Sequence, residues 1–68
     1  MNVLALYLNG KLVSRYTVSE SFTQDVLSDL HFGPKPVLCP ADQQVWDDAA
    51  HHDYDEALVY EDFDRVPF

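Results

Sequence analysis

The chain contains 68 residues with a single cysteine, and its 12 acidic residues against four basic ones give a net charge of −8. This length allows one small domain, Cys39 alone cannot form a disulfide within the chain, and no apolar run reaches the roughly 20 residues that span a bilayer. The negative charge argues against direct binding to nucleic acid or to an anionic membrane. No basic segment or cleavage site flanks the apolar run at residues 3–8, so we expect no signal peptide and a cytoplasmic protein.

The N-terminal part is predicted to form a β-hairpin. Residues 3–8 and 11–18 are strand-like and flank Asn9-Gly10, a pair that tolerates the positive φ angles of a type I′ turn. The first run is apolar on both faces, which is typical of an interior strand, and the second is more polar, as in an edge strand. A two-residue turn would pair Leu8 with Lys11, Leu6 with Val13, and Leu4 with Arg15.

A helix is predicted next, over residues 21–31. Ser21 and Gln24 have the spacing of a capping box at its start, and Gly33 is expected to end it in the left-handed conformation. The apolar stripe of this helix consists of Phe22, Val26, Leu27 and Leu30.

A proline-bounded segment around Val37 follows and is predicted to be an extended connector or at most a short edge strand. Residues 41–52 are predicted to form a second helix, with a loop as the alternative. Its thin apolar face consists of Val45, Trp46, Ala49 and Ala50. Trp46 is expected in the core, with an interface position as the alternative.

The C-terminal segment is predicted to form a strand over residues 57–63 beside the first strand, although a helix starting near Asp55 is also compatible with the composition. The elements together predict a single α+β domain over residues 1–68. In this fold an N-terminal hairpin carries a packed helix, and the C-terminal strand completes a mostly antiparallel sheet.

Charge divides the chain into two halves. Residues 1–35 carry three acidic and three basic residues and are neutral, whereas residues 36–68 carry nine acidic residues against Arg65 and account for the whole net charge. Carboxylates four apart on a helix or two apart on a strand lie about 5–7 Å from one another, a separation comparable to that of neighbouring phosphates. The candidate partner-binding residues are Asp47, Asp48, Asp53, Tyr54, Asp55, Glu56, Tyr60, Glu61, Asp62 and Asp64. The alternative is a solvated face that only keeps the protein soluble.

Acids interleaved with aromatic residues over positions 42–64 of a very small domain give the chain its resemblance to phage-encoded anti-defence proteins, which include anti-CRISPR proteins and DNA mimics. These proteins share no common fold or motif, so no residue is carried over from them. The resemblance implies a non-enzymatic inhibitor without a cofactor. It also implies that the partner is a basic nucleic-acid-binding protein or complex in the cytoplasm of a bacterial host.

Three other functions fit parts of the sequence. A homo-oligomeric assembly module, such as a homodimer, would use the aromatic residues as its interface. A metal site could use Asp47 with His51 or Asp48 with His52, which are four residues apart, but the spacing matches no established zinc motif. An enzyme with a Cys39 nucleophile is disfavoured because a chain this short has little scaffold for a substrate pocket, and a lone cysteine is more often a small buried apolar residue.

Overall fold

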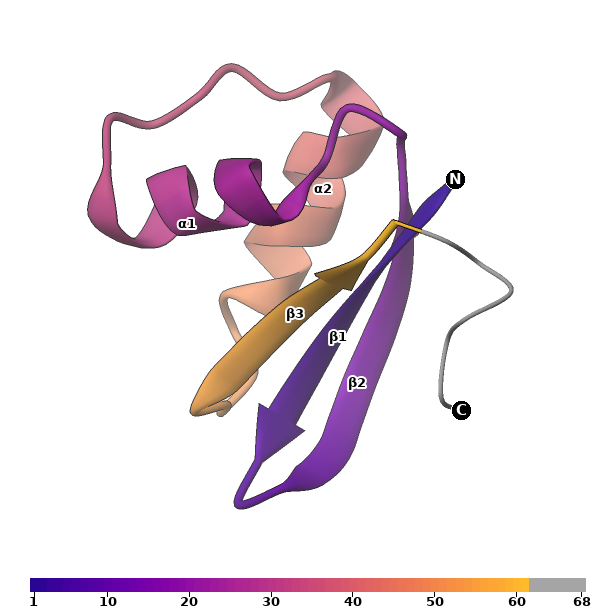
Figure 1. Ribbon diagram of the computed structural model, residues 1–68, viewed down its shortest axis with the longest axis vertical. Coiled ribbons are helices and arrows are strands. Elements are labelled where there is room, and N and C mark those ends of the chain that lie inside the picture. The colour runs from indigo at the N-terminus through magenta and orange to yellow at the C-terminus, as the bar shows by residue number, and fades with distance from the viewer. Residues whose placement is uncertain (62–68) are drawn as a thin grey trace.

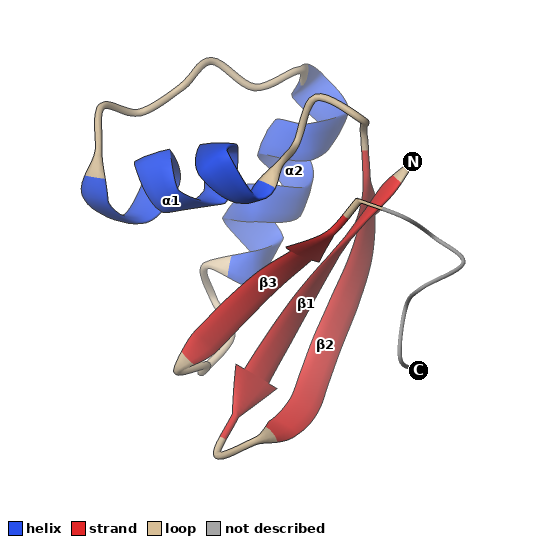
Figure 2. Ribbon diagram, in the orientation of Figure 1, coloured by secondary structure: helices blue, strands red, loops and turns tan. Residues whose placement is uncertain are grey.

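The computed structural model describes residues 1–61, which form an α+β domain (Figure 1). The elements in chain order are β1 (Asn2–Leu8), β2 (Lys11–Val18), α1 (Gln24–Phe32), α2 (Pro40–Ala49) and β3 (Glu56–Tyr60). The strands form one antiparallel sheet in the order β2-β1-β3, and both helices pack against the same sheet face (Figure 2). The predicted fold class, the central position of β1 and the edge position of β2 are confirmed.

The hairpin turn follows the prediction, but the pairing beyond it does not. Asn9 and Gly10 have φ angles of 53° and 80°, and Leu8 pairs with Lys11. Between Leu6 and Tyr7 the register shifts, so that Tyr7 pairs with Leu12 and Leu6 pairs with Ser14.

This shift leaves Val13 as the extra residue of a β-bulge, and the predicted pairs of Leu6 with Val13 and of Leu4 with Arg15 are wrong. Leu4 pairs with Tyr16 instead. Without the extra residue, Arg15 would lie on the helix-covered face and Tyr16 on the opposite one. The bulge exchanges the two, which avoids burying a guanidinium and brings the Tyr16 ring against the core.

Helix α1 begins later than predicted. Its N-cap is Thr23, whose hydroxyl oxygen accepts a hydrogen bond from the Val26 backbone N–H at 3.4 Å, so the predicted Ser21 capping box is wrong. The reason lies in the core, because Phe22 precedes the helix and is fully buried. Gly33 has a φ of −119°, so the predicted left-handed cap is also wrong. The position favours glycine for a different reason, because the Cβ of any other residue would lie only 2.9 Å from the Oδ1 atom of Asp29.

The predicted second helix is confirmed as α2, which begins one residue earlier than predicted and ends three residues earlier. It runs from Pro40 to Ala49, and its sheet-facing side buries Trp46 and Ala49 while Ala50 remains exposed. The connector at residues 34–39 forms no strand. Neither helix of residues 1–61 is long and apolar enough to cross a membrane.

Strand β3 pairs with β1 as predicted, from Tyr7 with Glu56 to Val3 with Tyr60. It begins one residue earlier than expected, and the last two residues of the predicted strand, 62 and 63, lie outside the described part of the chain.

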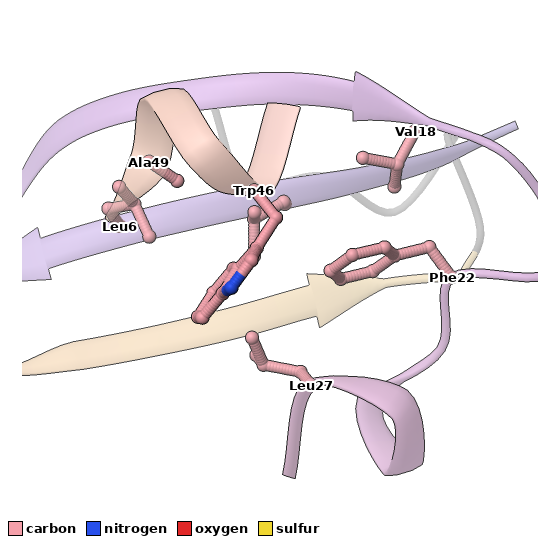
Figure 3. Packing of buried hydrophobic residues seen from close by; sticks show 7 residues of the cluster. Leu6, Val18, Phe22, Leu27, Trp46 and Ala49 are labelled. Carbon is pink, nitrogen blue, oxygen red and sulfur yellow. The ribbon is translucent and has the colours of Figure 1, made fainter. Parts of the chain in front are cut away.

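The core lies between the sheet and the two helices (Figure 3). It combines side chains that are distant in sequence: Leu4, Leu6, Val18, Phe22, Leu27, Trp46 and Ala49. Trp46 is 8% exposed and points between the sheet and Leu27 of α1, so its role as a core residue is confirmed.

Candidate partner-binding site

Half of the predicted binding residues gather at one end of the molecule. Figure 1 shows that the C-terminal end of α2, the start of β3 and the β1–β2 turn all lie there. The acidic residues on the α2 end, on the following turn and at the β3 start are Asp47, Asp48, Asp53, Asp55 and Glu56, and all five are exposed. These five residues are called the acidic end below.

Two of these carboxylates are oriented on α2 by neutral donors. The Tyr16 hydroxyl of β2 donates to Asp48 Oδ2 at 2.7 Å, and the Gln43 amide donates to Asp47 Oδ1 at 3.0 Å. His52 Nε2 lies 3.9 Å from Asp48 Oδ2 and forms an ion pair only when the imidazole is protonated. The Tyr16 contact depends on the β2 bulge, which places this ring on the helix-covered face.

A third carboxylate joins the α2–β3 turn to the hairpin. The Asn9 backbone N–H donates to Asp55 Oδ2 at 3.1 Å, and the Asp55 backbone N–H donates to the Tyr7 carbonyl oxygen at 2.9 Å. The side chain of Asp55 is thereby held beside the β1–β2 turn. Three of the five carboxylates are thus positioned before any partner binds, which lowers the entropic cost of binding.

The negative charge of the acidic end is not neutralised by the described residues. The ion pairs seen between described residues join the N-terminal amine to Glu20 and His52 to Asp48, so neither of them brings a lysine or arginine to the five carboxylates. An ionised carboxylate has about four acceptor positions, so the single neutral donors to Asp47, Asp48 and Asp55 leave most of them accessible. This end can therefore accept hydrogen bonds from several lysine or arginine side chains.

Tyr60 and Glu61 lie at the other end of β3 and do not join this group. Tyr60 pairs with Val3, four positions along the strand from the pairing of Glu56 with Tyr7. Its hydroxyl lies 2.8 Å from that of Tyr7, on the sheet face opposite the helices.

This tyrosine pair changes the acidity of the Tyr7 hydroxyl. The hydrogen bond with Tyr60, then burial, and then charge repulsion from Tyr60 and Glu56 raise the pKa of Tyr7 to about 12. The predicted binding residues Asp62 and Asp64 lie outside the described residues.

Tyr54 belongs to the acidic segment but is a structural contact. Its hydroxyl lies 3.0 Å from His31 Nε2, and the His31 ring meets Trp46 edge to face with centroids 5.2 Å apart. Tyr54 is half-buried, and burial raises its pKa. It links the end of α1 to the α2–β3 turn.

Asp42 has a structural role instead, which the sequence did not distinguish from that of the other acids. It is 2% exposed, and its carboxylate accepts hydrogen bonds from the backbone N–H and the hydroxyl of Ser19. Burial raises the pKa of Asp42, but the hydrogen bonds from Ser19 and from the Cys39 thiol outweigh it and leave the pKa below its ordinary value. Ser19 lies 23 positions away, so no local pattern indicates this contact.

The described residues do not form the arrangement that a metal site or a catalytic thiol would need. Residues 1–61 contain no group of three or more His, Cys, Asp or Glu side chains that could hold a metal ion. Cys39 is exposed at the start of α2, so the expectation that it is a small buried residue is wrong.

Comparisons of the chain with protein-family models, with curated proteins and with solved structures found no match.

Proposed function

We propose that the protein is a non-enzymatic inhibitor that places its acidic end on the basic nucleic-acid-binding site of a larger protein. The partner would be a host defence or DNA-processing protein, and the carboxylates would occupy positions that phosphates normally take. The observation that carries the proposal is the group of exposed carboxylates at one end of the molecule, three of them held by hydrogen bonds and none of them in an ion pair with a lysine or arginine of the described residues: Asp47, Asp48, Asp53, Asp55 and Glu56.

Electrostatics favour this use of the acidic end over a purely solubilising one. Like charges gathered at one end repel one another and destabilise a small domain, whereas dispersed polar residues would provide solubility without that cost. The same concentration of charge accelerates encounter with a positively charged groove. Binding of this kind weakens with salt, because exposed charges are screened over about 10 Å at about 0.1 M ionic strength.

The test is affinity capture from bacterial lysate at about 50 mM and about 300 mM salt, with two charge-matched variants. The first variant neutralises three residues of the acidic end that hold no other element in place: Asp47→Asn, Asp53→Asn and Glu56→Gln. The control neutralises three exposed acids elsewhere: Glu20→Gln, Asp25→Asn and Asp29→Asn. Both variants change the net charge by the same amount, from −8 to −5 (−8 + 3).

We expect the wild type and the control to capture a basic nucleic-acid-binding protein at low salt and less of it at high salt. The acidic-end variant should lose this protein. Equal loss in both variants would mean that only net charge matters, and retention by the acidic-end variant would exclude the proposal. The buried Trp46 provides a fluorescence check that each variant is folded.

The homo-oligomeric alternative has less support. Trp46, one of the aromatic residues it would place in an interface, lies in the core of the single chain. Tyr60 is already in contact with Tyr7.

A further inference from the structure

A groove of about 490 Å³ lies between α1 and β3. At one end the Gln24 side-chain oxygen accepts a hydrogen bond from the Val59 backbone N–H at 2.9 Å, and at the other end His31 contacts the Tyr54 hydroxyl. Figure 1 shows α1 beside β3, with its first turn near the end of that strand. The groove is therefore bounded by side-chain contacts at both ends and lies along an edge of the sheet.

The backbone of β3 presents hydrogen-bonding groups to this groove. β3 is an edge strand, and because its Val59 N–H donates to Gln24, this N–H points away from β1. Backbone groups of residues two apart on an antiparallel strand point to the same side, so the N–H and C=O of Ala57 also point toward the groove. The Gln24 oxygen occupies the position that a carbonyl of an additional strand would take.

The lining of the groove indicates which side chains such a strand would carry. Leu27 and Phe32 provide apolar surface on the α1 side, and Phe32 is 92% exposed. Asp55 and Glu56 provide negative charge at the start of β3, Glu56 on the sheet face of its pairing partner Tyr7, and the described residues of the lining include no lysine or arginine. Because side chains of a strand alternate between two faces, an occupant with alternating apolar and basic residues satisfies both sides.

We propose that this groove binds an extended basic segment of the partner protein as a fourth strand along β3. The segment displaces the Gln24 oxygen from Val59, pairs with Ala57, and directs its lysine or arginine side chains toward Asp55 and Glu56. This inference rests on the proposed function, since it describes how the partner approaches two residues of the acidic end. Edge-strand addition obtains affinity from main-chain hydrogen bonds and specificity from alternate side chains.

The test uses a fluorescently labelled Val-Lys-Val-Arg-Val-Lys-Val peptide as the probe. A control peptide of the same sequence is N-methylated at alternate residues, so that it keeps its charge but loses strand hydrogen bonds. The protein variant is Ala57→Pro, which removes the outward N–H and leaves all acids unchanged. Its matched control is Ala57→Ser, which keeps the N–H. Binding is followed by fluorescence anisotropy and by amide NMR shifts of the wild-type protein.

We expect the probe to bind the wild type and Ala57→Ser, and to shift the amides of Gln24, Ala57 and Val59. Ala57→Pro should weaken binding by about tenfold or more, as should N-methylation of the peptide. The two peptides compared on the wild type keep the test decisive if Ala57→Pro fails to fold. Equal binding of both peptides, or no binding of the probe, would overturn the groove inference.

These results are separable from those of the lysate experiment. Loss of the captured protein in the Asp47, Asp53 and Glu56 variant together with equal binding of the two peptides would leave the proposed function intact without the groove. Retention of the captured protein in that variant would remove the proposed function, whatever the peptides show.

Discussion

Asp42 and Asp48 both lie on α2, and their surroundings give them different roles. Asp42 is buried and accepts hydrogen bonds from Ser19, so its charge stabilises the fold. Asp48 is exposed, accepts one bond from Tyr16, and keeps acceptor positions toward solvent. Neutralising Asp42 should therefore lower the stability of the fold, and neutralising Asp48 should mainly affect binding of the partner.

Asp42→Asn tests this structural role through its pH dependence. The folded-state pKa of Asp42 lies below its ordinary value of 3.8, so the ionised carboxylate stabilises the fold above that pH, and this contribution is lost as the pH falls through the folded-state pKa. We expect the variant to lose about 1.5–3 kcal/mol at neutral pH, the usual contribution of hydrogen bonds to a charged group. The difference from wild type should shrink well below pH 3.8 in urea unfolding. Asp47→Asn, on the exposed side of α2, is the control and should change stability by less than about 0.5 kcal/mol. An equal loss at both pH values would contradict a charge-dependent role.

The Tyr7–Tyr60 contact should make the fold sensitive to alkali. The pKa of Tyr7 is raised from 10.0 to about 12, so the protonated phenol stabilises the fold below pH 10.0, and this stabilisation disappears as the pH rises toward 12. Tyr7→Phe should remove about 0.5–1.5 kcal/mol of stability at neutral pH by deleting the shared hydrogen bond. Its unfolding free energy should then vary less than that of the wild type across that alkaline range. In a double-mutant cycle with Tyr60→Phe, the two losses should sum to more than the loss of the double variant, and strict additivity would indicate that the hydroxyls do not interact.

Among the elements, those with local signals were predictable. Asn9-Gly10 determines its own turn geometry, and the apolar first strand indicates its interior position. The predictions were wrong where a contact between residues distant in sequence decides the strand register or the start of a helix. The β2 bulge depends on packing Tyr16 rather than Arg15 against the core, and the start of α1 depends on burying Phe22 before the helix begins.

The position at which α1 begins can be tested by replacing Thr23 and Ser21 with alanine, one at a time. Thr23→Ala removes the observed N-cap and should lower the free energy of unfolding by about 1 kcal/mol. In a domain of this size that corresponds to a melting temperature lower by about 4–8 °C. Ser21→Ala, which alters the cap predicted from the sequence, should change the melting temperature little. The reverse order of the two effects, measured by circular dichroism, would contradict the α1 boundary.

The part of the candidate site that is contiguous in sequence was predictable. The contiguous run from Asp47 to Glu56 crosses one helix end and one strand start, so the fold keeps its acids together. Tyr60 separates from them because β3 extends away from this end and turns its ring to the face opposite the helices. The groove could not be predicted, because it arises from the packing of α1 against an edge strand more than 20 positions later in the chain.

At the scale of the whole molecule, the core and the acidic end have separate roles. The hairpin, the two helices and β3 enclose one small core, while the end opposite to Tyr60 along β3 concentrates the exposed carboxylates. Phosphate mimicry requires that this end compete with nucleic acid for the same surface of the partner. Simple attachment elsewhere on that partner would leave its nucleic-acid binding unchanged.

The most direct measurement is therefore a competition experiment with the captured partner and its labelled nucleic acid, followed by fluorescence anisotropy. The wild type and the Glu20, Asp25 and Asp29 variant should release the nucleic acid in a concentration-dependent way, and the Asp47, Asp53 and Glu56 variant should fail to do so. Formation of a stable ternary complex in which the partner holds this protein and its nucleic acid together would contradict the account.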